Sequence, residues 1–260
     1  MSGSIVPTFS PEDGLLRLPA DGLRALAAWG QRPRARRLRA DETEATSLLT
    51  ELGVVGPDGV HPLLHPVSKT LARPLVRIDV RVGFPASPSV VNGWVVPGWA
   101  VFSLPVRGTT RGLRDIVAVH PTRVPGVVAM VTSLGPRPIP CLPAPVVLPT
   151  AAARALVFAQ GGLDQAAVLD AAKVEEPWRG ALERLAALRI RTWAARSRWA
   201  PANQVASRAL RVVDGGEAGL WIWTDATVEG RPVTQLVAVA SSVVWRHVTA
   251  LLPDGDDRAP

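Results

Sequence analysis

Ile116-Val-Ala-Val119 and Leu236-Val-Ala-Val239 are the stretches that decide the fold, because they show that the chain repeats itself. The second tetrad begins at residue 236 and the first at residue 116, an offset of 120 residues. Each tetrad leads into an apolar stretch that ends at a helix-breaking residue, Gly135 in one case and Pro253 in the other. A period this long is not that of a stacked-repeat protein. The repeat therefore predicts two similar halves folded against each other.

A tryptophan-bearing strand precedes each tetrad and extends the repeat. These strands are Gly98-Trp-Ala-Val-Phe102 and Gly219-Leu-Trp-Ile-Trp223. A short valine-rich string can recur by chance in a chain as rich in valine as this one, and that is the alternative. The matched order of four strands and a helix favours a true repeat.

The predicted organisation is a single domain, residues 1–260, of α+β class. Its halves cover about 20–135 and 150–252, and a connector at 136–149 holds six prolines, which exclude a helix or a central strand. Short turns between consecutive strands predict antiparallel pairing. The first half is predicted to have strands at 75–82, 90–96, 99–104 and 113–119, then a helix at 122–134. The second is predicted to have helices at 150–159, 164–172 and 178–188, strands at 189–196, 205–213, 219–226 and 233–239, and a helix at 241–252.

Composition indicates a globular protein of the cytoplasm. Hydrophobic residues make up 47% of the chain and charged residues 20%, which suits a packed core rather than disorder. No apolar run approaches the roughly 20 residues that cross a bilayer, so no membrane association is expected. Residues 1–13 lack the basic-then-apolar pattern of a signal peptide. The single cysteine, Cys141, cannot form an internal disulfide.

The net charge of +7 allows two interpretations. Lys69 and Lys173 are the only lysines, so nearly all the basic charge comes from arginine. A basic surface favours acidic partners or phosphate backbones. The excess of Arg over Lys, together with abundant Ala, Val, Pro and Gly, is also what a GC-rich genome produces.

Motifs for catalysis are missing from the sequence. Ser133 is not in a nucleophile elbow, and no phosphate-binding loop precedes Lys69. His61 and His65 are four residues apart and could present two imidazoles to a metal, but the prolines beside them distort a helix and no third ligand is near. Cys141 has no activating partner close by in the sequence. We therefore expect no enzymatic activity, no metal and no cofactor.

The basic run Arg32–Arg39 motivates an alternative function, nucleic-acid binding. Clustered arginines can neutralise phosphates. No recognisable nucleic-acid-binding motif accompanies the run, so a solvated loop is the simpler interpretation and nucleic acid is not the expected partner.

The tryptophans and their neighbouring arginines are the candidate partner-binding residues. Trp221 and Trp223 lie on one face of their strand because side chains alternate, and core packing is the simplest role for them. Trp and Arg together on an exposed face are, however, typical of protein-binding surfaces. The candidates are Arg107, Arg111, Trp193, Trp199, Trp221, Trp223 and Arg231.

Three further segments carry a resemblance to a known family. Leu52-Gly-Val-Val-Gly-Pro-Asp-Gly59 joins two helices, Leu71-Ala-Arg-Pro74 ends a helix, and Asp225-Ala-Thr-Val-Glu-Gly-Arg231 precedes the last strand. Over residues 20–252 the chain resembles the EspG family, the cytosolic chaperones of the actinobacterial type VII (ESX) secretion system.

The resemblance implies a fold, a function and a partner. The fold would be quasi-two-fold, with a central, largely antiparallel sheet and helical bundles. The function would be to bind the apolar tip of a PE–PPE heterodimer, keep it soluble and deliver it to its secretion machinery, without catalysis. The chain departs from the family in Arg32–Arg39 and in the loop Arg107–Gly112, so the identity of the client is not carried over. A homodimer formed through sheet edges or helix faces is a further possibility.

Overall fold

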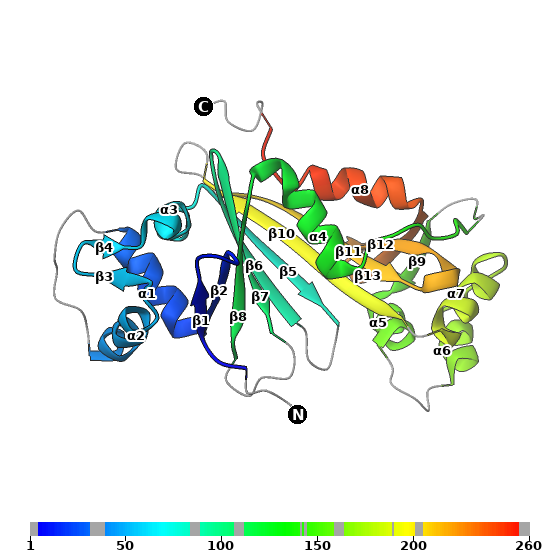
Figure 1. Ribbon diagram of the computed structural model, residues 1–260. Coiled ribbons are helices and arrows are strands. Elements are labelled where there is room, and N and C mark those ends of the chain that lie inside the picture. Colours follow the sequence, from blue (N-terminus) through cyan, green and yellow to red (C-terminus); the bar gives the residue numbers. More distant parts are fainter. Residues whose placement is uncertain are drawn as a thin grey trace.

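The fold is α+β, with a large antiparallel sheet, in a computed structural model that describes residues 5–31, 40–83, 89–106, 112–140, 142, 145–158, 164–188, 190–200 and 205–254 (Figure 1). No described helix is both long and apolar enough to cross a membrane.

The first half of the chain contributes a hairpin, three helices, four long strands and a fourth helix. The four long strands and the last helix confirm the elements expected there. The elements are β1 (Thr8–Ser10), β2 (Leu15–Leu18), α1 (Ala20–Gly30), α2 (Ala40–Glu51), β3 (Val55–Gly56), β4 (Gly59–Val60), α3 (His65–Ala72), β5 (Val76–Val82), β6 (Ser89–Val96), β7 (Trp99–Pro105), β8 (Arg114–Val119) and α4 (Val124–Thr132).

The second half likewise runs from three helices through four long strands to a final helix, with a short strand before them. The helices and strands expected there are also confirmed, with ends that shift by a few residues. The elements are β9 (Val146–Pro149), α5 (Thr150–Phe158), α6 (Gln165–Ala171), α7 (Trp178–Ala187), β10 (Arg191–Trp199), β11 (Ala206–Asp214), β12 (Leu220–Val228), β13 (Arg231–Val239) and α8 (Ser241–Thr249).

The main sheet joins both halves through its two middle strands. Its order among the described residues is β1-β2-β8-β7-β6-β5-β10-β11-β12-β13-β9, and every pair of neighbours is antiparallel. β5 and β10 pair from Val76 opposite Trp199 to Val82 opposite Trp193. The proline-rich connector ends in β9, which pairs with β13 at the sheet edge, where proline is tolerated.

The two tetrads explain why each half packs as it does. Ile116 and Leu236 point to one face of the sheet and are buried under helices there. Val119 and Val239 point to the other face and pack in a core that includes α4 and α8. Each tetrad thus sends apolar side chains to both faces of the sheet, as expected of a strand with helices on both sides.

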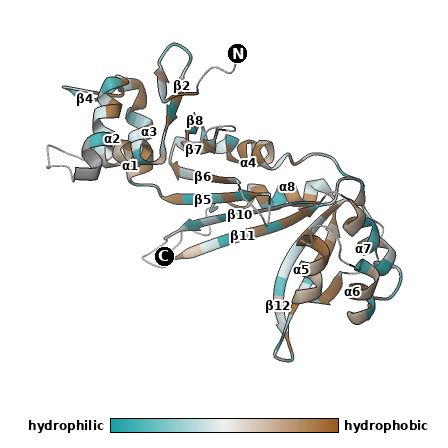
Figure 2. Ribbon diagram, turned by 90° about the horizontal axis from the view of Figure 1, so that it is seen from below, coloured by the Kyte–Doolittle hydropathy of each residue, from teal (hydrophilic) through white to brown (hydrophobic). Residues whose placement is uncertain are grey.

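Helices cover the two faces of the sheet differently. On one face, α4 and α8 lie side by side over the middle strands (Figure 1) and enclose a core with β5, β6, β7, β10 and β11. On the other face, α1–α3 cover β2, β7 and β8 at one end, while α5–α7 cover β12 and β13 at the opposite end. Figure 2 shows these two helical groups apart, with β5, β6, β10 and β11 exposed between them.

The connector is held against the second half by polar contacts. Arg137 donates two hydrogen bonds of 2.9 Å to the carboxylate of Asp214, whose side chain is only 5% exposed. The Arg137 backbone N–H donates to Ser241 Oγ, and that hydroxyl donates to the Gly135 carbonyl. The hydrogen bonds to Asp214 raise the pKa of Arg137, so the guanidinium stays charged. The start of the connector is thus fixed to β11 and α8.

Candidate partner-binding surface

The uncovered middle of the sheet carries a regular array of arginines. Residues directly opposite each other in antiparallel strands share a face. Arg77 is opposite Arg198, Asp79 is opposite Arg196, and Arg81 is opposite Ala194. On β11, the residues opposite Arg198, Arg196 and Ala194 are Ser207, Ala209 and Arg211. We call these nine residues the open face.

One pair on the open face is unfavourable for stability. Arg77 and Arg198 lie directly across from each other on β5 and β10. Like charges at opposite positions of a sheet are destabilising, and residues that break a local rule gather at functional sites. Arg198 also pairs with Asp79, which offsets part of the repulsion, and the array is a candidate binding surface.

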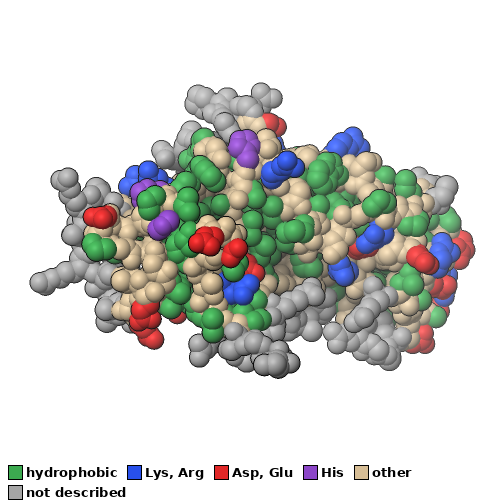
Figure 3. Space-filling model, viewed as in Figure 1, with side chains coloured by type: hydrophobic (Ala, Val, Ile, Leu, Met, Phe, Trp, Pro, Cys, Tyr) green, Lys and Arg blue, Asp and Glu red, His purple; other side chains and the backbone are tan. Residues whose placement is uncertain are grey.

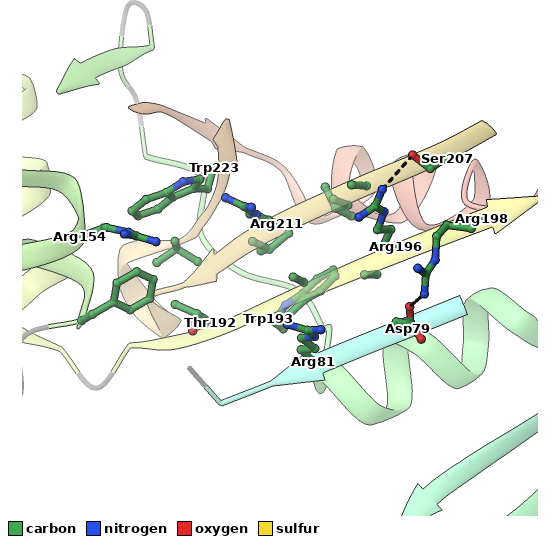
Figure 4. A pocket seen from close by; sticks show the side chains of 17 residues that line it. Asp79, Arg81, Arg154, Thr192, Trp193, Arg196, Arg198, Ser207, Arg211 and Trp223 are labelled. Atoms are coloured by element: carbon green, nitrogen blue, oxygen red, sulfur yellow. Dashed lines mark hydrogen bonds and ion pairs between the residues drawn. The ribbon is translucent and has the colours of Figure 1, made fainter. Parts of the chain in front are cut away.

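A groove of about 440 Å³ runs over most of the open face (Figure 4). Its floor consists of β5, β10 and β11, and α5 contributes Arg154 and Phe158 to one wall. The rings of Phe158 and Trp223 are tilted against each other with centroids 5.6 Å apart, and they form the apolar side of the groove.

The groove has more positive than negative side chains. It is lined by Arg81, Arg154, Arg196, Arg198 and Arg211, against a single carboxylate from Asp79. Asp79 accepts a hydrogen bond from Arg198, and Arg196 makes only a long 3.5 Å contact to Ser207 Oγ. Within the described part of the chain, Arg81 and Arg154 form no ion pair. The groove is therefore suited to an anionic ligand.

Asp225 is held by three donors, two of which, Trp223 and Arg211, line the groove. Trp223 Nε1 donates to its Oδ1 at 2.6 Å, Thr234 Oγ1 donates at 3.0 Å, and Arg211 forms an ion pair with its Oδ2. Burial by itself raises the pKa of Asp225, but the hydrogen bonds from Trp223, Thr234 and Arg211 outweigh it and hold the pKa below its usual value. Asp225 is therefore ionised at neutral pH.

β11 and β12 separate beside the groove. They pair only where residues 212–214 face residues 220–222, although each strand has nine residues. The corresponding strands of the first half, β6 and β7, pair over residues 92–96 and 99–103. We call the gap between residues 206–211 of β11 and residues 223–228 of β12 the fork. The ion pair of Arg211 with Asp225 spans it.

The four candidate tryptophans are core residues in this structure. Trp193 and Trp199 pack in the core under α4 and α8, while Trp221 and Trp223 pack under α5–α7, and none of the four is more than 9% exposed. The reason lies in the alternation of β10, which turns its tryptophans to the covered face and Arg196 and Arg198 to the open face. All four side chains are packed in the core, and two of them, Trp193 and Trp223, also border the groove.

The remaining candidates fall in different places. Arg231 is exposed beside the turn between β12 and β13, away from the groove lining. Arg107, Arg111 and the run Arg32–Arg39 lie outside the described residues.

The two histidines singled out for metal binding have local roles. His61 Nδ1 accepts a 3.4 Å hydrogen bond from the Leu63 N–H, and its ring contacts Phe9 edge-on. His65 begins α3. In the described ranges, no three His, Cys, Asp or Glu side chains gather in a group that could hold a metal ion.

The groove arginines were not among the candidates from sequence, although a signal for some of them was present. Arg77, Asp79 and Arg81 alternate with valine and isoleucine. Arg196 and Arg198 alternate with alanine, serine and tryptophan. Alternation of this kind marks one polar face on each strand. The two polar faces lie side by side because β5 pairs with β10. Arg154 lies next to them because its helix, α5, packs beside β12.

The opposite side of the molecule has a different character. Figure 3 shows hydrophobic side chains gathered over the middle of this side, where α4 and α8 lie. Met130 of α4 is 61% exposed and Trp245 of α8 is 42% exposed. The protein therefore has one arginine-rich face and one face with exposed apolar side chains.

Comparison with protein-family models found none that matches the chain, and comparison with curated proteins found no match either.

Proposed function

We propose that this protein is a non-enzymatic, EspG-like secretion chaperone of the cytoplasm that binds a PE–PPE-like heterodimer. Two features support the quasi-two-fold arrangement of that family. The order of helices, four long strands and a final helix occurs twice, and β5 and β10, the first long strand of each half, adjoin at the middle of the sheet. The tetrads of the two halves occupy equivalent positions in β8 and β13.

The observation that carries the proposal is the open face between two helical groups. It spans three strands, β5, β10 and β11, and is flanked by α1–α3 and α5–α7 (Figure 2). Protein partners are received by surfaces of this kind, whereas small substrates occupy enclosed apolar pockets with a few converging polar groups. Arginine suits such a surface because its stem is apolar and its guanidinium forms several hydrogen bonds.

The test is direct reconstitution with candidate clients. The chain is co-expressed with each of a panel of PE–PPE heterodimers, and soluble complex is measured by size-exclusion chromatography with light scattering. A stoichiometric complex that keeps at least one heterodimer soluble is the expected result. Failure of the whole panel, with the client aggregating as it does alone, would contradict the proposal. The same light-scattering data show whether the free chain is a homodimer.

Nucleic-acid binding is a second candidate, favoured by the positive groove. It predicts affinity for random-sequence duplex that falls steeply as salt rises, because phosphate contacts release counterions. Filter binding at low and moderate salt checks this. Weak binding even at low salt removes the second candidate.

A further inference from the structure

The fork leaves two strand edges without a strand partner. Residues 206–211 of β11 pair with β10 on one side only, and residues 223–228 of β12 pair with β13 on one side only, within the described sheet. An unpaired edge presents backbone N–H and C=O groups that can pair with another extended chain. Several recognition domains bind peptides by adding a strand at such an edge.

The groove follows the backbone of β11 beside this edge. Residues 209–213 of β11 line it consecutively, so both the edge and the face of the strand border the space. Ala209 is exposed and Ala194 is half-buried between the groove arginines. These small side chains leave room for a chain to lie against the strand, and the arginines project around it.

The acidic residues already present show which chemistry satisfies these arginines. Asp225 reaches across the fork from β12 to pair with Arg211, and Asp79 pairs with Arg198. Arg81 and Arg154 have no such carboxylate among the described residues, while Arg196 has only its long contact to Ser207. Carboxylates on an incoming chain would supply ion-pair partners for the arginines that lack one.

We propose that the fork binds an extended, acidic segment of a partner protein as an added strand on β11. Alternate residues of an added strand point to one face, so acidic residues at every second position would meet Arg154 and Arg196. This spacing also sets the register, since a shift by one residue would turn the acidic side chains away from the arginines. The inference rests on the proposed function in one respect, namely that the segment belongs to the client.

The experiment uses the full chain and fluorescein-labelled eight-residue peptides in which Glu alternates with Thr. Fluorescence anisotropy is measured for this peptide and for the same peptide with Lys in place of Glu. The Glu peptide should bind and the Lys peptide should not. N-methylation of the Glu residues and of the Thr residues, in separate peptides, then tests backbone pairing. Only one of these two peptides should lose binding, because a strand uses alternate residues for pairing with a given edge.

Charge reversals locate the site; Arg154→Glu and Arg196→Glu are each measured alone, so that each matches the control in its change of charge, and are then combined. Arg196→Glu combined with Arg154→Glu should weaken the Glu peptide about tenfold or more, as loss of partly desolvated charge pairs does. Arg246→Glu is the control, since Arg246 is exposed on α8, which covers the opposite face. It should change the affinity less than about twofold, because surface charges at this distance are screened. Circular dichroism confirms that each variant is folded.

Several outcomes overturn the inference. If Arg246→Glu lowers the affinity for the Glu peptide as much as the groove variants do, the peptide is attracted by net charge alone. If both N-methylated peptides bind equally well, the peptide does not pair as an added strand. A preference for a single-stranded oligonucleotide over the Glu peptide assigns the groove to nucleic acid instead. The two proposals fail separately. If the peptide binds but no PE–PPE complex forms, the proposed function fails, and if complexes form equally with Arg154→Glu/Arg196→Glu, this inference fails.

Discussion

At the scale of single residues, the tryptophans of β10 are buried and its arginines Arg196 and Arg198 are exposed. Trp221 is 1% exposed, and its Nε1 donates a 2.9 Å hydrogen bond to the Ala218 carbonyl. Arg196 on β10 is exposed and points into the groove (Figure 4). Gly93 shows the tightness of the core, since a Cβ there would lie 2.7 Å from the ring of the fully buried Phe102.

Trp221→Ala should destabilise the fold by about 3–5 kcal/mol, because it removes a large buried side chain and leaves a cavity. Arg231→Ala, at an exposed position, should change the free energy of unfolding by less than about 0.5 kcal/mol. Urea unfolding of both variants checks this. An unchanged midpoint for Trp221→Ala would show that the side chain is not part of the core.

Asp225 should make stability depend on pH in the acid range. Its pKa is lower in the folded protein than in the unfolded chain, where it is about 3.9. The ionised group therefore stabilises the fold above the unfolded pKa, and this contribution is lost as pH falls through the folded pKa. The wild-type protein should be more stable than Asp225→Asn at pH 6, and the difference should shrink below about pH 4. Urea midpoints at several pH values measure it, and a difference that stays constant from pH 6 to pH 3 would contradict the assignment.

At the scale of elements, two features give the second half its own character. The connector is fixed by Arg137 to Asp214 at the end of β11 and to Ser241 at the start of α8. β12 leaves β11 after three paired residues, and the long hairpin of β12 and β13 carries Asp225 across the fork to Arg211. Equivalent strands of the two halves therefore differ, because β6 and β7 stay paired over five residue pairs, whereas β11 and β12 separate after three.

Arg137→Ala should lower the stability by about 2–3 kcal/mol, because it leaves the carboxylate of Asp214 buried without its main partner. Arg24→Ala is the control, since its pair with Asp21 is largely exposed and contributes less than about 1 kcal/mol. Thermal unfolding followed by circular dichroism compares the two. Equal effects would mean that the connector is not held by this ion pair.

At the scale of the whole molecule, one core crosses the boundary between the halves. Ile78 of β5 and Phe102 of β7 belong to the same buried cluster as Trp193 of β10 and Val248 of α8. β5 and β10 also share a ladder of seven residue pairs. Neither half can bury its apolar face without the other.

The full chain should therefore unfold in a single cooperative transition, and a fragment of residues 1–140 should not fold alone. Urea curves from far-ultraviolet circular dichroism and from tryptophan fluorescence should coincide, which is the standard sign of two-state unfolding. Two separated transitions, or a fragment with a cooperative transition of its own, would show that the halves are independent units.

The sequence by itself determined the long strands of both halves, the helices of the second half and α4, and the order of these elements. Alternation in β5, the glycines that begin the Trp-bearing strands and the prolines of the connector are local signals, and the strands and helices that they predicted are present. The antiparallel pairing of consecutive strands followed from their short turns. The extension of the sheet by β2 and β9 was not predicted, because these short strands pair with β8 and β13 far along the chain.

Only the tertiary structure decided which face of each strand is covered, and so where the candidate site lies. The alternation in β10 shows that tryptophans and arginines point to opposite faces, but it does not show which face the helices cover. That depends on α4 and α8 packing beneath the tryptophans and on α1–α3 and α5–α7 leaving the arginines open. The open face arises from contacts between residues more than 100 positions apart, such as Asp79 with Arg198, and such contacts leave no local pattern in a sequence.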